Sequence, residues 1–205
     1  MLRNRLIFVL YFNDGFFAQS RNFSLQKVGN LTWLVKNYEF IKNSKFIDEL
    51  IILDVTRKNS NIEVFAKIVE AISSNCFIPI TAGGRLNRLE EVRVLLNTGI
   101  DKVLVNSALY KNNEFVYELS QEYGDQFIVG AVDFKRNNNG GYETLHTDGA
   151  IKSGESLFET LNRIKNLPIG DVMLNSINQD GTSNGLDLGC LNLLPKDFSK
   201  PLILA

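Results

Sequence analysis

Residues 172–185 read VMLNSINQDGTSNG, an apolar run that ends in a polar loop. Two glycines, Gly181 and Gly185, interrupt this loop shortly after Asp180. Proteins built on parallel sheets place catalytic carboxylates and phosphate-binding amides where a buried strand gives way to such a loop. The stretch therefore predicts a strand of a parallel sheet, with a candidate functional site at its carboxyl end.

The same combination recurs along the chain, because short apolar runs repeatedly end on polar or glycine residues. The expected strands and their ends are 6–12 before Asn13-Asp14, 50–54 ending on Asp54, 77–81 before Gly83-Gly84, 102–105 before Asn106-Ser107, 127–132 before Asp133, 171–174 before Asn175-Ser176, and 201–205. Apolar residues at helical spacing predict the intervening helices, at 31–41, 62–72, 86–97, 113–123 and 156–164. Residues 137–147, with an Asn-Asn-Asn-Gly-Gly centre, are expected to form a β-hairpin insertion.

Strand–helix repeats with apolar strands indicate a parallel sheet covered by helices, either doubly wound or closed as a barrel. The barrel is favoured because the polar strand ends fall at one end and no dinucleotide fingerprint follows the first strand. Residues 10–13 (LYFN) and 132–135 (VDFK) occupy equivalent strand ends, which indicates an internal repeat. We therefore expect an α/β fold, a (β/α)8 TIM barrel of two half-barrel repeats. It forms one domain, 1–205, with a first half-barrel at 1–125 and a second at 126–205 that is incomplete, truncated after the seventh strand.

The composition of the chain argues against several classes of function. The 22 Lys and Arg residues nearly balance the 23 Asp and Glu residues, so no strong field attracts nucleic acid or a membrane surface. Cys76 and Cys190 lie far apart without metal-ligand spacing, so neither a disulfide framework nor a metal site is expected. The apolar run 6–12 is interrupted too early for a signal peptide, and no run approaches the ~20 residues of a spanning helix. A cytoplasmic protein is expected.

The order of these strand ends resembles the HisF family, the cyclase subunit of imidazole glycerol phosphate synthase, over essentially the whole chain. The matching residues are Met1-Leu2 with Arg5, Asp14-Gly15, residues 48–54, Gly83-Gly84, Asp101-Lys102-Val103 with Asn106, Asp133 with Lys135-Arg136, and residues 176–185. The resemblance implies a subunit that takes ammonia from a glutaminase partner, HisH. It would combine this ammonia with a phosphoribulosyl formimino nucleotide, and it needs no cofactor.

The resemblance also implies catalytic residues. Family members use two aspartates for acid–base chemistry, and Asp180 matches the second, although an Asp before glycine is also a common turn residue. Tyr11 stands where the first is expected, and Gln19 replaces a loop lysine. A phenol titrates about six units above an Asp carboxyl, so Tyr11 cannot act as the same base. Asp133, at another strand end, is the further catalytic candidate.

Two further sites follow from the resemblance. Arg5, Glu49, Lys102 and Asp171 begin strands and match a ring of charges that forms the ammonia gate; a salt-bridge plug at the barrel floor is the alternative. The candidate phosphate and substrate ligands are Gly83, Gly84, Asn106, Ser107, Gly181, Thr182, Asp54 and Lys135. A tight turn without a ligand is the alternative for the glycine pair, and Arg85 stands where the family has a third glycine. His146, the single histidine, is expected at the surface.

Three functions remain open at this stage. The Tyr11 departure resembles HisF paralogues encoded with polysaccharide genes, in which a HisH/HisF-like pair supplies ammonia to a separate sugar amidotransferase. The second is the authentic histidine-pathway cyclase. The third is a non-catalytic module that binds phosphate or assembles with partners. The expected substrate of either enzyme is a phosphorylated or nucleotide-linked small molecule.

Overall fold

The computed structural model describes residues 4–38 and 46–205. Its contacts divide the chain into two compact units. Unit 1 comprises Met1–Gln19 and Leu25–Leu104, and unit 2 comprises Ser20–Ser24 and Val105–Ala205. Residues 39–41 of the helix expected at 31–41, and the Met1-Leu2 pair of the family match, lie outside the described residues.

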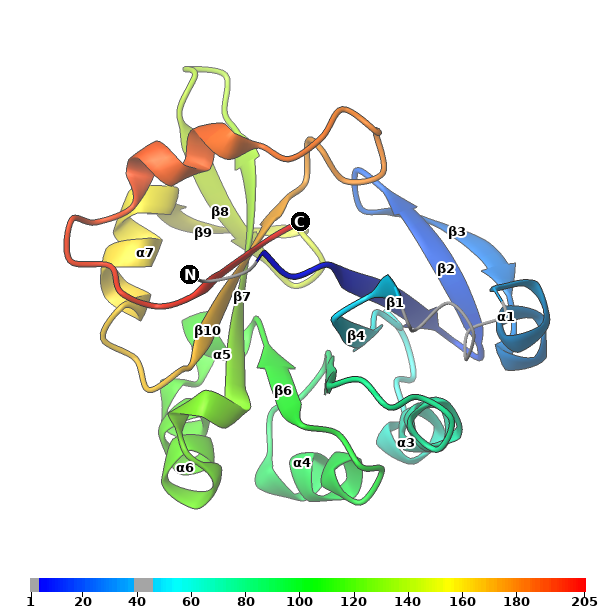
Figure 1. Cartoon of the computed structure of the whole chain (residues 1–205). Helices are drawn as coiled ribbons and strands as arrows, with labels where there is room; N and C mark the ends of the chain where they lie inside the picture. The colour runs from blue at the N-terminus through cyan, green and yellow to red at the C-terminus, as the bar shows by residue number, and fades with distance from the viewer. Residues whose placement is uncertain (1–3, 39–45) are drawn as a thin grey trace. The chain divides into compact units, whose positions relative to one another are not determined.

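Unit 1 is a mainly parallel sheet with helices between its strands (Figure 1). Its elements are β1 (Ile7–Asn13), β2 (Phe16–Arg21), β3 (Ser24–Gly29), α1 (Leu31–Tyr38), β4 (Glu49–Asp54), α3 (Ile62–Ser73), β5 (Ile80–Gly83), α4 (Leu89–Leu96) and β6 (Lys102–Val105). The strand order is β6-β5-β4-β1-β2-β3. β1, β4, β5 and β6 run parallel, with Ile7 opposite Glu49 and Leu50 opposite Ile80. The strands and helices predicted for this part of the chain are therefore confirmed, although their first and last residues differ from the predicted ones.

Unit 2 combines a parallel set of strands with an antiparallel extension (Figure 1). Its elements are α5 (Ala108–Lys111), α6 (Asn113–Tyr123), η2 (Asp125–Phe127), β7 (Ile128–Arg136), β8 (Tyr142–His146), β9 (Ile151–Ser156), α7 (Leu157–Ile164), β10 (Asp171–Ser176), η3 (Leu188–Leu193) and β11 (Leu202–Leu204). β10 pairs in parallel with β7 and with β11. β8 pairs antiparallel with β7, and β9 with β8.

Sequence explains why these segments form. Every residue of β10 is buried, as expected for a parallel strand covered on both faces. Helix α3 begins where the Asn61 side chain accepts hydrogen bonds from the amides of Glu63 and Val64, at 2.9 and 3.2 Å. Ser156 and Glu159 form a capping box at the start of α7. The buried strands and capped helices fix the strand ends that carry the candidate site.

Both units repeat one succession of elements, which confirms the predicted half-barrel repeat and the (β/α)8-barrel class. β1 is followed by β2, β3, α1 and β4, and β7 by β8, β9, α7 and β10. In each case the first strand pairs antiparallel with the next and parallel with the last. Tyr11 lies opposite Leu53 in unit 1, and Asp133 lies opposite Asn175 in unit 2. The LYFN and VDFK segments therefore do occupy equivalent strand ends.

Two parts of the structure differ from the sequence prediction. The β2–β3 hairpin was not predicted, and Asp14-Gly15 was expected only to end the first strand. Asp14 and Gly15 have φ values of 49° and 81°, so this dipeptide forms the tight turn that joins β1 to β2. The insertion expected at 137–147 is larger: Asn137–Gly141 turns β7 into β8, and β9 follows.

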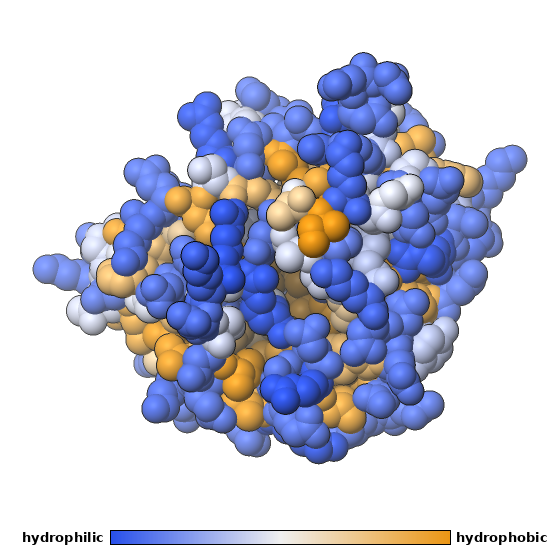
Figure 2. Space-filling view, turned by 180° about the vertical axis from the view of Figure 1, so that it is seen from behind, coloured by the Kyte–Doolittle hydropathy of each residue, from blue (hydrophilic) through white to orange (hydrophobic). Residues whose placement is uncertain are grey.

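No helix within residues 4–38 and 46–205 is long and apolar enough to cross a membrane. The side of the molecule seen in Figure 2 is largely hydrophilic, with hydrophobic residues exposed in separate patches.

Candidate active site

Asp133 is the centre of a buried polar cluster in unit 2. It lies near the carboxyl end of β7 and is only 8% exposed. Its Oδ1 accepts a hydrogen bond from Asn175 Nδ2 at 3.2 Å, and its Oδ2 accepts one from Asn106 Nδ2 at 3.1 Å. Asn106 also donates to the carbonyl of Ala131 at 3.0 Å, which fixes the orientation of its amide. The carboxyl group is thus held by two side-chain donors from neighbouring strand ends.

The environment of Asp133 makes its carboxyl group suitable for proton transfer. Burial raises its pKa to about 7; hydrogen bonds from Asn175 and Asn106 oppose this rise, and the nearby charges of Asp148 and Asp180 add to it. A group with a pKa near neutrality is present in both its acidic and basic forms at pH 7. Asp133 is therefore the described carboxyl group whose chemistry best fits a general acid or base.

Asp180 is bound to the tip of the β2–β3 hairpin, which belongs to unit 2. Its Oδ2 accepts hydrogen bonds from Ser20 Oγ at 2.6 Å and from the amide of Phe23 at 2.9 Å. Its carbonyl accepts the amide of Asn22 at 3.0 Å. A Cβ atom at Gly181 would come within 2.0 Å of the Ser20 carbonyl, so only glycine fits there. The contact between the residue 180 loop and this hairpin was not predicted from the sequence.

The glycine pair after β5 brings backbones together in unit 1. A Cβ at Gly83 would lie 2.2 Å from the Leu104 carbonyl, and one at Gly84 would lie 2.2 Å from that of Asp54. Asp54 itself accepts hydrogen bonds from the Thr56 amide and the Ser60 hydroxyl, at 2.9 and 2.6 Å. Arg85 has a φ of 65°, a conformation that favours glycine. The close packing explains both glycines without a ligand, and a phosphate role for them remains a prediction.

Three of the four other candidate ligands, Asn106, Thr182 and Lys135, have side-chain partners within the protein. The Asn106 side chain donates a hydrogen bond to Asp133, and Ser107 precedes the four-residue helix α5. Thr182 donates its hydroxyl to the Gln179 carbonyl at 2.8 Å. Lys135 forms an ion pair with Glu143 across the β7–β8 hairpin, at 3.6 Å. Within the described ranges, no group of three or more His, Cys, Asp or Glu residues could hold a metal ion.

Comparison with known proteins shows the family. The family described as histidine biosynthesis protein matches residues 19–205. The chain is 40% identical over 204 residues to a protein of Parasynechococcus marenigrum (strain WH8102) provisionally named imidazole glycerol phosphate synthase subunit hisF2. That alignment covers 100% of this chain and 76% of the relative. This chain belongs to the HisF family.

Two further HisF relatives are similar over almost the whole chain. The imidazole glycerol phosphate synthase subunit HisF of Clostridium botulinum (strain Alaska E43 / Type E3) is 35% identical over 99% of this chain and 79% of the relative. The subunit of the same name from Helicobacter hepaticus (strain ATCC 51449 / 3B1) is 31% identical over 98% and 79%. The resemblance based on the strand ends is therefore confirmed.

The HisF-like chain carries Tyr11 at the β1 position equivalent to Asp133. Tyr11 lies opposite Leu53 of β4 and Ala18 of β2, near the carboxyl end of its strand. Gln19, for which the resemblance predicts a lysine in family members, is exposed on β2. The two half-barrels thus present different groups at equivalent strand ends, a phenol in unit 1 and a carboxyl in unit 2.

The four residues of the predicted HisF-like ammonia gate all lie at or just before the amino end of a strand. Arg5 precedes β1 and forms an ion pair with Glu49, the first residue of β4. Lys102 is the first residue of β6, opposite Thr81 of β5. In unit 2, Asp171 is the first residue of β10 and is 4% exposed. The Arg5–Glu49 pair is formed, and the ring of four remains a prediction.

His146 is buried, so the expectation that it lies at the surface was wrong. It is 6% exposed, and its ring packs against that of Tyr110 with centroids 5.1 Å apart. Its Nδ1 lies 2.8 Å from Thr147 Oγ1. Burial lowers the pKa of His146, with a smaller contribution from Lys111. Residues 144–146 of β8 are all buried, so this histidine lies in the packed part of the hairpin rather than in a solvated loop.

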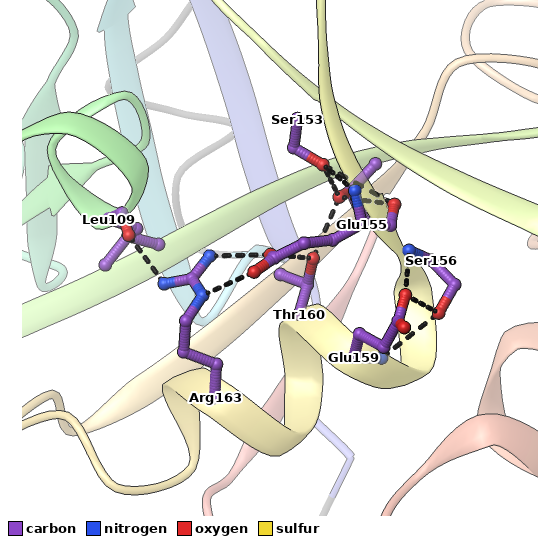
Figure 3. A network of polar contacts seen from close by, with 8 residues as sticks. Leu109, Ser153, Glu155, Ser156, Glu159, Thr160 and Arg163 are labelled. Atoms are coloured by element: carbon purple, nitrogen blue, oxygen red, sulfur yellow. Dashed lines mark hydrogen bonds and ion pairs between the residues drawn. The ribbon is translucent and has the colours of Figure 1, made fainter.

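A second polar cluster, centred on Glu155 and Arg163, supports the β8–β9 hairpin (Figure 3). Arg163 donates to both carboxylate oxygens of Glu155 at 2.9 Å, and to the carbonyl of Leu109 at 2.7 Å. Thr160 donates to Glu155 at 2.8 Å. The cluster therefore joins the end of β9 to α7 and α5, and it was not predicted from the sequence.

Proposed function

We propose that this HisF-like chain is the synthase subunit of a glutamine amidotransferase. It receives ammonia from a HisH-like glutaminase, and Asp133 transfers protons while the ammonia reacts. The observation that carries this proposal is the buried Asp133 carboxyl group, held by Asn106 and Asn175 and titrating near neutrality. The relatives named as synthase subunits support it.

The chemistry needs a group that both accepts and donates a proton. When ammonia attacks an amide-type carbon, the nitrogen loses a proton as the new C–N bond forms. The oxygen leaves as water only after it receives protons. A carboxyl group with a pKa near 7 can perform both steps at neutral pH. We propose a phosphorylated or nucleotide-linked acceptor, with amidation of a surface-polysaccharide sugar, directly or through a separate amidotransferase, as the end use.

An apolar surface in unit 1 supports a protein partner. Leu6, Phe46 and Phe77 are 60%, 78% and 95% exposed. They lie just before β1, β4 and β5, which are neighbouring parallel strands, so all three belong to the amino end of the sheet. The Arg5–Glu49 ion pair lies at this same end. Exposed aromatic side chains beside charged groups are typical of protein interfaces, and we propose that the glutaminase binds here and that Arg5, Glu49, Lys102 and Asp171 gate the ammonia.

The alternative function is the cyclase of histidine biosynthesis. The names of the relatives favour it, since each is named as an imidazole glycerol phosphate synthase subunit. Tyr11 argues against it, because a phenol is a far weaker acid than the carboxyl group expected there. Turnover of the formimino nucleotide with ammonium salts would establish the cyclase; its absence would favour another acceptor.

The glutaminase partnership is tested by measuring glutamine hydrolysis by the HisH-like glutaminase of the same genome, with and without this chain. We expect hydrolysis to rise when the chain is added. Phe77→Ser should weaken the complex on the order of tenfold, because truncating a central aromatic contact costs about 1–2 kcal/mol. Phe158→Ser, at a residue of α7 that is 47% exposed, is the matched control and should bind normally. Unchanged hydrolysis and no binding would instead support a non-catalytic module.

A further inference from the structure

The tip of the β2–β3 hairpin is fastened to the loop after β10 by one carboxyl group. Ser20 and Phe23 both donate to the same oxygen of Asp180, at 2.6 and 2.9 Å. The backbone adds a third bond, from the Asn22 amide to the Asp180 carbonyl at 3.0 Å. The Asn22 side chain donates to the carbonyls of Ile177 and Asn178, at 2.9 and 3.2 Å. Hydrogen bonds to an ionised carboxylate are among the stronger ones in proteins.

The hairpin turn is not held by its own conformational preference. Asn22 and Phe23 both have positive φ, 50° and 62°. Asparagine tolerates this conformation, but a bulky aromatic residue is disfavoured where two-residue hairpins usually place glycine. Backbone strain of this kind persists only where surrounding contacts impose it. Asp180 supplies such a contact at the Phe23 amide.

A glycine in a third loop receives the Phe23 ring. A Cβ atom at Gly149, in the turn between β8 and β9, would come within 2.8 Å of Phe23 Cδ2 and 3.2 Å of Ile177 Cδ1. The absence of a side chain at Gly149 therefore lets the ring pack closely against this turn. The hairpin tip is held on one side by the Asp180 carboxylate and on the other by apolar contact.

We infer that Asp180 is a positioning residue, which fastens the hairpin tip to the loop whose Ile177 amide donates to the carbonyl of Phe134, next to Asp133, at 2.9 Å. This role differs from the proton transfer expected from the sequence. The inference concerns the architecture of the site and does not depend on which acceptor is amidated, so it can fail while the proposed function stands, and the reverse.

Amide hydrogen exchange measured by NMR tests the inference without an activity assay. Asp180→Ala removes the acceptor, and exchange at the Phe23 amide should accelerate on the order of tenfold or more. Asp180→Asn keeps one acceptor oxygen and should remain within a few-fold of the native rate. Ser20→Ala removes one partner without changing the charge and should give a smaller acceleration than Asp180→Ala. Thr182→Val, in the same loop, is the matched control and should leave Phe23 unchanged.

The exchange rates decide whether Asp180 holds the hairpin tip. Unchanged exchange at Phe23 in both Asp180→Ala and Ser20→Ala would overturn the inference. If Asp180→Ala does not fold, Ser20→Ala alone decides, because it preserves the carboxylate. A second readout is the pKa of Asp133, which should fall in Asp180→Asn, since the Asp180 charge raises it in the native protein. A pKa of Asp133 that stays constant would show that the fastened tip does not lie beside the site.

Discussion

Asn175 Nδ2 lies 3.2 Å from Asp133 Oδ1, and the two residues are register partners on the parallel strands β10 and β7. Both side chains are buried, at 8% exposure each. The amide can donate to the carboxylate but cannot neutralise it. The pair therefore moderates, without abolishing, the effect of burial on the carboxyl group.

Replacing Asn175 with leucine should raise the pKa of Asp133 above its native value. The Asn175 hydrogen bond favours the ionised form of Asp133, so its loss favours the protonated form. A titration of the Asp133 side-chain carbon by NMR in the variant and the native protein checks this. A lower pKa in the variant would show that the amide does not stabilise the carboxylate.

Asp133 should make the native protein less stable as pH rises. Its pKa is about 7 in the folded state, and an unfolded Asp titrates near pH ~3.9, so the folded state binds more protons between these values. The free energy of unfolding should therefore fall between about pH 4 and pH 7, by on the order of a few kcal/mol. Urea unfolding of the native protein and of Asp133→Asn, at pH 5 and pH 8, measures the difference. Equal pH dependence in both proteins would contradict the assignment.

Gly83→Ala should destabilise unit 1 by about 1–3 kcal/mol, because the new methyl group would press on the β6 backbone. Its Cβ would lie 2.2 Å from the Leu104 carbonyl, and backbone cannot move as a side chain does. Gly15→Ala is the control, since it has open space and only its φ of 81° opposes alanine. Urea unfolding measures both variants, and a Gly83→Ala protein no less stable than the control would refute the packing role.

The Glu155–Arg163 cluster should contribute measurably to the stability of unit 2 (Figure 3). Arg163→Met keeps much of the side-chain volume but removes the donors to Glu155 and to the Leu109 carbonyl, so we expect a loss of about 1–3 kcal/mol. The pKa of Glu155 is lowered mainly by the Arg163 hydrogen bond. The stabilisation should therefore disappear as pH falls through the folded-state pKa of Glu155. Thermal unfolding at pH 7 and pH 3 tests both statements, and equal losses at the two pH values would contradict the second.

The barrel class could be predicted because buried parallel strands are apolar throughout and end at one edge in polar residues. Residues 172–174 illustrate this, since these three apolar residues are buried in β10 and the polar Asn175 and Ser176 follow them. The hairpins were harder to predict. β2 alternates between buried and exposed residues too weakly to stand out, and the Asp14-Gly15 turn was the one clear signal for it.

The sequence predicted which residues belong to the candidate site better than it predicted which of them contact one another. Asp133 stands at a strand end in the sequence, but its neighbours Asn106 and Asn175 come together only through strand register. The contact between Asp180 and Ser20 joins residues 160 positions apart, and no local pattern encodes such a contact. Burial of His146 likewise depends on the Tyr110 ring, which the hairpin sequence does not contain.

The most direct measurement of the central claim is the pKa of Asp133 in the native protein, obtained by NMR titration of its carboxyl carbon. Asp133→Asn identifies the signal, since the resonance disappears in that variant. The account predicts a midpoint near pH 7, well above the ordinary value of about 3.9. A midpoint close to 4 would contradict it, because Asp133 would then be fully ionised at neutral pH and could not donate a proton in the proposed reaction.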